Sequence, residues 1–129
     1  MNVLDENILK DQRQLLLDWR ISVRQIGFNV GRKGIQDEEI IPLLLQLQRP
    51  TFFTLDKGFY KYTFCHERYC IVCLEVGDNH AAQFVKRFLR QPSFNTAAKR
   101  MGTVIRVSHV GLSVWRFHSE KKAHVEWAD

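Results

Sequence analysis

Short apolar runs that end in carboxylates alternate with longer amphipathic segments through residues 2–90, and this order most limits the fold. The first run, Asn2–Leu4, ends in Asp5. The β-branched and aromatic run Thr51–Leu55 ends in Asp56. A buried strand of a parallel sheet shows such a run and becomes polar where it leaves the sheet. Strands that alternate with helices predict a three-layer α/β/α sandwich with a mainly parallel sheet.

The other segments are expected to complete one domain over residues 1–129. Helical spacing of apolar side chains predicts helices at 8–19, 37–47, 80–90 and 95–101, and strand patterns appear at 21–26 and 69–76. Pro42 fits the second of these helices only near its start. Two alternating segments, Thr103–Val107 and Gly111–Phe117, flank a short turn. They predict a C-terminal β-hairpin.

Composition limits the class of protein and its compartment. The chain is 45% hydrophobic and 26% charged, which is typical of globular proteins. Nineteen Lys and Arg against fourteen Asp and Glu give a net charge of +5, which favours a polyanionic partner without proving one. The apolar stretches are far shorter than the roughly 20 residues that cross a bilayer. The first residues lack the features of a signal peptide, so we expect no membrane association and a cytoplasmic location.

Three cysteines lie close together, at Cys65, Cys70 and Cys73. With His66 they could supply four ligands to zinc, but the spacing lacks the paired CxxC motifs of structural zinc sites. Cys70 and Cys73 lie in an apolar run, where cysteine behaves as a small hydrophobic residue. An odd number of cysteines in a short segment also argues against disulfides, so reduced, buried thiols are the favoured interpretation.

Three aspartates are candidates for one catalytic site. Asp5 and Asp56 end predicted strands, and Asp37 begins a helix that leads into the strand before Asp56. Carboxyl ends of parallel strands share one edge of the sheet, where functional groups collect. Three carboxylates there repel one another unless a cation neutralises them, and Mg²⁺ or Mn²⁺ prefers such oxygen ligands. These metals activate phosphodiester hydrolysis, in which Glu6 could orient a water.

Each acid also has an ordinary structural explanation when taken alone. Asp37 stands at a helix start, and Asp56 precedes Lys57 and Gly58 in a turn-forming sequence. Their common placement at strand ends and at a helix start is what favours a site.

Basic residues near the acids are candidates for nucleic-acid binding. Arg32 and Lys33 lie in a Gly-rich loop, and Lys57 and Lys61 follow Asp56, where they could hold phosphates of RNA. A second basic group could extend this surface or face a protein partner. It consists of Lys86, Arg87, Arg90, Lys99, Arg100 and Arg106.

The acidic segments together resemble a known family. They are Val-Leu-Asp-Glu-Asn near the start, Gln-Asp-Glu-Glu-Ile-Ile at a helix start and Phe-Thr-Leu-Asp-Lys-Gly-Phe after a strand. In this order, across residues 2–76, they resemble the short PIN-like proteins, relatives of VapC-type toxins. By this resemblance Asp5 matches the first PIN acid, Asp37 the helix-start Asp and Asp56 the Asp of the Thr-x-Asp stretch.

The resemblance implies an Mg²⁺- or Mn²⁺-dependent endoribonuclease with metal ligands Asp5, Asp37 and Asp56. Many PIN-like proteins are toxins of type II toxin–antitoxin pairs, so the implied partners are single-stranded RNA, a cognate antitoxin and a second copy of the chain in a homodimer. The helical segment that carries a further Glu in full-length PIN domains is almost absent here. The available substitutes are Glu6, Glu38 and Glu39. The alternative is a catalytically silent PIN-like module that binds RNA or a protein.

Overall fold

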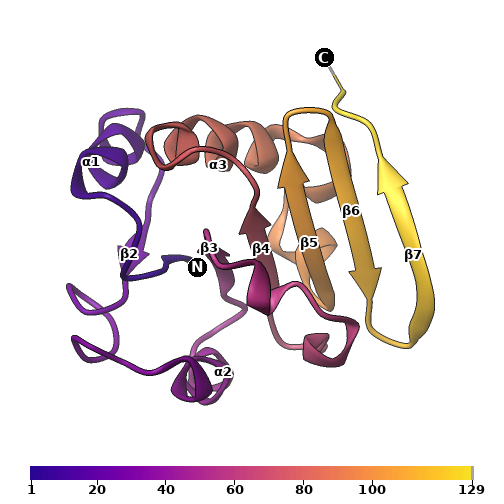
Figure 1. Cartoon of the computed structure of the whole chain (residues 1–129), viewed down its shortest axis with the longest axis horizontal. Helices are drawn as coiled ribbons and strands as arrows, with labels where there is room; N and C mark the ends of the chain where they lie inside the picture. The colour runs from indigo at the N-terminus through magenta and orange to yellow at the C-terminus, as the bar shows by residue number, and fades with distance from the viewer. Residues whose placement is uncertain (129) are drawn as a thin grey trace.

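A seven-stranded sheet forms the centre of the molecule, which we describe for residues 1–128 of a computed structural model (Figure 1). The strand order is β2-β1-β3-β4-β5-β6-β7. The first five strands run parallel to one another, and β6 and β7 are antiparallel to their neighbours. The mainly parallel sheet that the strand–helix alternation predicts is therefore present.

The parallel strands are short and apolar. They are β1 (Asn2–Leu4), β2 (Arg24–Gln25), β3 (Thr51–Thr54), β4 (Cys70–Leu74) and β5 (Thr103–Ser108). Every residue of β3 and β4 is buried, because helices cover both faces of this part of the sheet. Only two residues of the expected strand at 21–26 pair with β1, so that prediction is confirmed in part.

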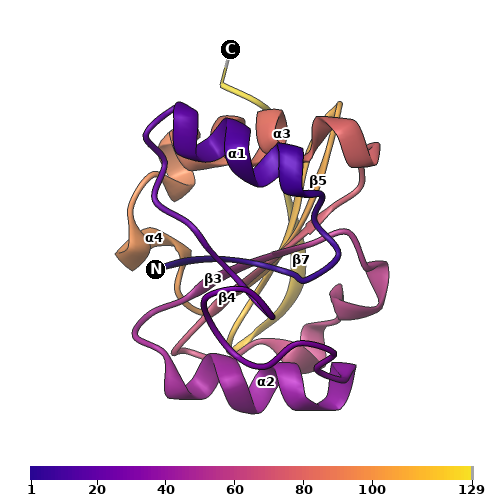
Figure 2. The same ribbon diagram turned by 90° about the vertical axis from the view of Figure 1, so that its left-hand side faces the viewer.

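Helices cover the two faces of the sheet, as Figure 2 shows edge-on. Helices α1 (Lys10–Asp18) and α3 (Ala81–Arg90) lie together on one face, and α2 (Asp37–Gln46) lies on the other. The two faces have separate apolar cores, one around Leu4 and Phe53 and the other around Val3 and Phe52. This arrangement confirms an α/β sandwich with helices on both sides.

Short helical turns complete the connections between these elements. The expected helix at 95–101 is the single turn α4 (Ala97–Arg100). Four 3₁₀ turns also occur: η1 (Lys57–Phe59), η2 (Tyr62–Phe64), η3 (Asp78–His80) and η4 (Pro92–Phe94). Turns η1 and η3 follow β3 and β4, so they lie at the carboxyl edge of the sheet.

The C-terminal part of the sheet is larger than the sequence pattern indicates. The predicted hairpin is formed by β5 and β6 (Gly111–Arg116), but a third strand, β7 (Ser119–Val125), pairs with β6. Most residues of β7 are exposed, so its sequence carries no apolar alternation that would reveal a strand. The terminal hairpin is therefore an antiparallel three-stranded meander.

Pro42 lies in the second turn of α2, and the helix continues to Gln46. The expectation that Pro42 fits only near the start of a helix is wrong here. Proline removes one backbone hydrogen bond from the helix. Burial of Ile40 and Leu44 against the sheet holds the helix together on both sides of the proline.

The three cysteines are free thiols. Cys70 and Cys73 are buried strand residues, and burial raises the pKa of each thiol to about 12. Within the described residues, His, Cys, Asp and Glu side chains form no group of three or more that could bind a metal, so the zinc alternative has no support from the geometry. Over the same residues, no helix has the length and apolar character of a membrane span.

Candidate active site at the carboxyl edge of the sheet

Asp5 is the buried centre of the candidate site. It follows β1 directly, and its backbone N–H donates to the Phe53 carbonyl of the neighbouring strand β3 at 2.9 Å. Its side chain faces β3 as well, where the Thr54 hydroxyl donates to Asp5 Oδ2 at 2.6 Å. Only 8% of Asp5 is exposed. The sheet therefore holds this carboxylate in one orientation at the edge.

Gln25 of β2 fixes the backbone around Asp5 from the other side. Its buried side-chain amide donates to the Asp5 carbonyl at 3.0 Å and to the Ile8 carbonyl at 2.7 Å. Its Oε1 accepts a hydrogen bond from Arg13 of α1 at 2.6 Å. One glutamine thus joins β2, the turn after β1 and the first helix. This network keeps the turn that carries Asp5 from moving.

Asp37 and Asp56 stand near Asp5 but are exposed. Asp37 is the first residue of α2, and Asp56 follows β3 and caps η1 by accepting from the Gly58 N–H at 2.8 Å. Thr54 connects the acids, because its hydroxyl also accepts from the Asp56 N–H at 3.0 Å. Burial raises the pKa of Asp5, the Thr54 hydrogen bond lowers it, and the charges of Asp37 and Asp56 raise it further.

The three predicted metal ligands are therefore within electrostatic range of one another. In the described residues, however, they are not drawn together into a group able to hold a metal ion. Asp5 is held by its buried hydrogen bond from Thr54, whereas Asp37 and Asp56 are exposed and the Asp56 side chain is engaged as the cap of η1. The donor set fits a hard divalent cation, because it consists of carboxylate oxygens whose mutual repulsion a cation would relieve.

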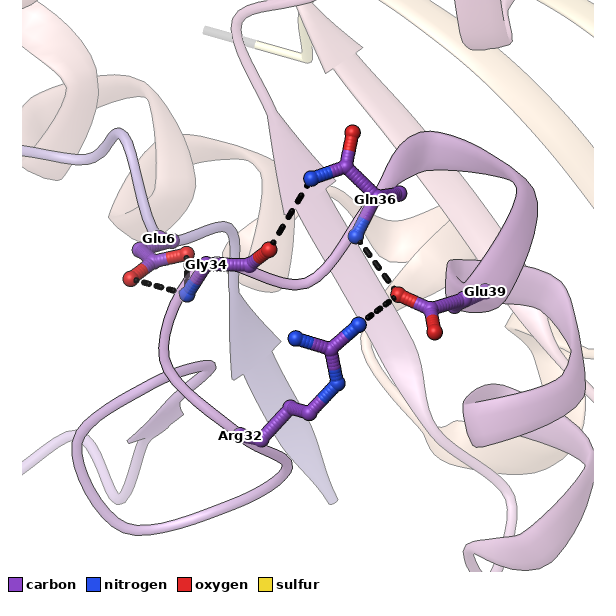
Figure 3. A network of polar contacts seen from close by, with 5 residues as sticks. All are labelled: Glu6, Arg32, Gly34, Gln36 and Glu39. Carbon is purple, nitrogen blue, oxygen red and sulfur yellow. Dashed lines mark hydrogen bonds and ion pairs between the residues drawn. The ribbon is translucent and has the colours of Figure 1, made fainter.

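Glu6 fastens the Gly-rich loop to the site (Figure 3). Its two carboxylate oxygens accept from the Gly34 N–H at 3.0 and 3.1 Å. The same side chain lies against Gly27, where a Cβ atom would approach Glu6 Oε2 to 2.6 Å and where φ is +83°. Gly27 is therefore required by both close approach and backbone conformation. Glu6 holds the loop in this structure, and its predicted role toward a water stays a prediction.

The start of α2 is fastened in a similar way (Figure 3). Gln36 caps the helix, and the Glu39 side chain returns to accept from the Gln36 N–H at 2.8 Å, which completes a capping box. Glu39 also pairs with Arg32 at 2.5 Å. These contacts set the position of Asp37, which lies between the two capping residues.

The predicted RNA-binding residues lie in separate segments: Arg32 and Lys33 precede α2, Lys57 is the first residue of η1, and Lys61 lies between η1 and η2. Arg32 and Lys33 are exposed in the loop before α2, although Arg32 is paired with Glu39. Lys57 pairs with Glu75 at 3.5 Å, and Lys61 lies 5.7 Å from the centre of the Phe64 ring. The second basic group does not form one surface. Arg100 is buried at the amino end of β3, and Arg106 lies beside Glu75.

Comparisons with protein-family models, curated proteins and solved structures found no match. The three acids supply carboxylate oxygens, the ligand type that a hard divalent cation prefers, although within the described residues they form no group able to hold one. Lys and Arg side chains lie in the segments around them. An acidic centre surrounded by basic loops is chemically suited to a phosphodiester.

Two residues that organise the site, Gln25 and Thr54, are absent from the sequence predictions. Thr54 precedes Asp56 by two residues and could have been found as part of the strand end. The role of Gln25 depends on β2 being the neighbour of β1, which no local pattern shows. Glu75 and Arg106 also meet only because β4 and β5 are adjacent.

Proposed function

We propose that this chain is a PIN-like endoribonuclease that uses Mg²⁺ or Mn²⁺ to hydrolyse phosphodiester bonds in single-stranded RNA. The proposal includes a role as the toxin of a type II toxin–antitoxin pair, with a cognate antitoxin as partner. Asp5, Asp37 and Asp56 would hold the metal, and Arg32, Lys33, Lys57 and Lys61 would contact RNA.

One observation carries the proposal. Asp5 is buried at the end of β1, and the like charges of Asp37 and Asp56 disfavour its ionised form. Asp5 accepts hydrogen bonds from the Thr54 hydroxyl and the Glu6 backbone, but the described residues give it no ion pair, so no cation balances its charge. Groups with perturbed pKa values at the carboxyl edge of a parallel sheet are candidates for function.

The residues divide the work of such a reaction among themselves. Thr54 orients the Asp5 carboxylate, and Gln25 holds the turn that carries it. A bound divalent cation would polarise the scissile phosphate and stabilise the leaving oxygen. The basic loops would bind the phosphates on either side of the cut.

The deciding experiment is cleavage of a mixed single-stranded RNA with Mn²⁺ or Mg²⁺. We expect the wild type to cut, and we expect Asp5→Asn and Asp56→Asn each to lower the rate by at least about 100-fold, because each removes a ligand charge. Chelation with EDTA should stop cleavage completely. Asp11→Asn is the matched control, since Asp11 is exposed on α1, and it should cut like the wild type.

If the folded wild type is inert with either metal, or if Asp5→Asn cuts as fast as the wild type, the nuclease proposal is wrong. Circular dichroism of each variant separates lost activity from lost folding.

A second candidate is a catalytically silent PIN-like module that binds RNA or a protein. This candidate is favoured because, within the described residues, the three acids do not form a group able to hold a metal ion. Such a module would bind RNA equally well with and without Asp5, and Mn²⁺ would not raise its thermal midpoint. Mn²⁺ would raise the thermal midpoint of a nuclease that binds the ion with Asp5, because an ion that binds only the folded state stabilises it.

A further inference from the structure

Glu75 joins two cations from different parts of the chain at the carboxyl edge. It is the first residue after β4, and its Oε1 lies 3.5 Å from Lys57 Nζ while its Oε2 lies 3.4 Å from Arg106 Nε. Lys57 belongs to η1 after β3, and Arg106 belongs to β5. We call these three side chains the Glu75 cluster. It brings together the ends of three adjacent strands.

One member of the Glu75 cluster, Arg106, lies on a row of side chains that leads across the sheet to Asp5. Thr54 pairs with Cys73, and Cys73 pairs with Arg106, so the side chains of these residues point to one face. That face is the one covered by α2, because Cys73 belongs to the α2-side core. Thr54 contacts Asp5, so the row runs from Asp5 across β3 and β4 to Arg106.

The two cations are held in place but remain open to solvent. The Lys57 side chain is 72% exposed and that of Arg106 is 39% exposed. The Arg106 guanidinium also lies 5.4 Å from the centre of the Tyr60 ring, which limits its movement. An open hollow of about 400 Å³ lies beside two members of the cluster, Lys57 and Glu75, and Arg106 is not part of its lining. Its other lining residues are Leu55, Leu74, Val76, Gly77 and His109.

The charge of the Glu75 cluster is not balanced internally. One carboxylate faces two cations, so the cluster keeps a net positive charge next to an edge that carries Asp5, Asp37 and Asp56. A simple surface ion pair contributes little to stability. Two cations beside one carboxylate, of which Arg106 lies on the row that leads to Asp5, are instead suited to contact an anion.

We propose that Lys57 and Arg106 bind a backbone phosphate of the single-stranded RNA, with Glu75 as the residue that positions both cations. Arg106 lies on a strand about 14 Å from that of Asp5, because three inter-strand spacings of about 4.8 Å separate β5 from β1. We therefore assign the bound group as a flanking phosphate rather than the one that is cut. This inference rests on the proposed function for the identity of the RNA as substrate.

Binding without cleavage tests the cluster separately from catalysis. A short fluorescein-labelled single-stranded RNA is titrated in EDTA, and anisotropy gives its affinity at several salt concentrations. We expect Lys57→Gln and Arg106→Gln each to weaken binding about fivefold. Each loss should also reduce the slope of log affinity against log salt by about 0.7, because one phosphate contact is removed.

Matched controls remove the same charge elsewhere. Lys121→Gln and Lys122→Gln on β7 alter exposed residues away from the cluster, and both should bind RNA like the wild type. Equal losses in the control variants, or unchanged binding in Lys57→Gln, would overturn the proposal. Lys57 is largely exposed, so its variant remains informative if Arg106→Gln fails to fold.

The outcomes also separate the two proposals. If the protein cuts no RNA but its binding depends on Lys57 and Arg106, the nuclease proposal fails and the phosphate site stands. If it cuts RNA and binding is unaffected by both variants, the phosphate site fails and the nuclease proposal stands.

Discussion

The two ends of β3 bury charged groups in opposite ways. At the amino end, Thr51 accepts a hydrogen bond from Arg100 Nε at 2.9 Å, and at the carboxyl end, Thr54 donates to Asp5 at 2.6 Å. Arg100 and Asp5 are similarly buried, with 7% and 8% exposed. The same strand therefore supports a cation at one edge of the sheet and an anion at the other.

The difference lies in the partners that complete each site. Arg100 also donates to the Phe94 carbonyl at 2.8 Å, so its guanidinium joins β3 to the segment before α4. Asp5 has the exposed acids Asp37 and Asp56 as its charged neighbours. A buried charge whose hydrogen-bond partners are neutral acceptors is consistent with a structural role. A buried charge with like charges nearby is instead a candidate functional group.

The largest expected effect is at the amino end. Arg100→Met should lower the free energy of unfolding by about 2 to 3 kcal/mol, because the Thr51 hydroxyl and the Phe94 carbonyl lose a charged donor. Urea denaturation followed by circular dichroism measures it. Lys99→Met is the control, since Lys99 is exposed on the same turn. A loss no larger than that of the control would remove the contrast between the two ends.

A smaller effect of opposite sign is expected at the carboxyl end. The pKa of Asp5 is raised by burial, so Asp5 contributes stability below its ordinary pKa of 3.8, and this contribution is lost as the pH rises through the raised value. Asp5→Asn should therefore stabilise the metal-free protein at about pH 7 by on the order of 1 kcal/mol. Thermal unfolding in EDTA from about pH 4 to about pH 7 should show this gain growing with pH. A variant less stable than the wild type at neutral pH would show that Asp5 is structural.

The smallest difference is expected at the two thiols of β4 that lie opposite the two ends of β3. Cys70 pairs with Thr51 and Cys73 pairs with Thr54, so each lies beside one of the two charged sites. Burial raises both pKa values to about 12, which leaves about one thiolate in ten thousand at about pH 8. Both thiols should resist Ellman's reagent until the protein unfolds. Rapid labelling of Cys73 alone would show that the carboxyl end opens more readily.

The parallel half of the fold could be predicted because its strands are buried on both faces. Val3 and Leu4, like Phe52 and Phe53, supply neighbouring apolar side chains to opposite cores, and such runs are visible in the sequence. Strand β7 could not be predicted, because its residues are mostly exposed and burial is what produces the pattern. The continuation of α2 past Pro42 depends on packing against the sheet and has no local signal.

The candidate site was predictable to a similar extent. The sequence predicts Asp5 and Asp56 as site residues because a strand end is a local feature. It does not predict the hydrogen bonds from Gln25 and Thr54, because these depend on β1 lying between β2 and β3. Local patterns therefore locate the acids, and strand order determines which groups restrain them.

The two outer strands of the sheet affect how the protein can associate with other copies of itself. An outer strand with free backbone groups can pair with another chain, and short length or charged side chains oppose such pairing. At one side β2 has only two residues, and at the other β7 carries Glu120, Lys121 and Lys122. Association by strand addition is thus opposed at both sides of the sheet, and any pairing of protomers is directed to the helical faces.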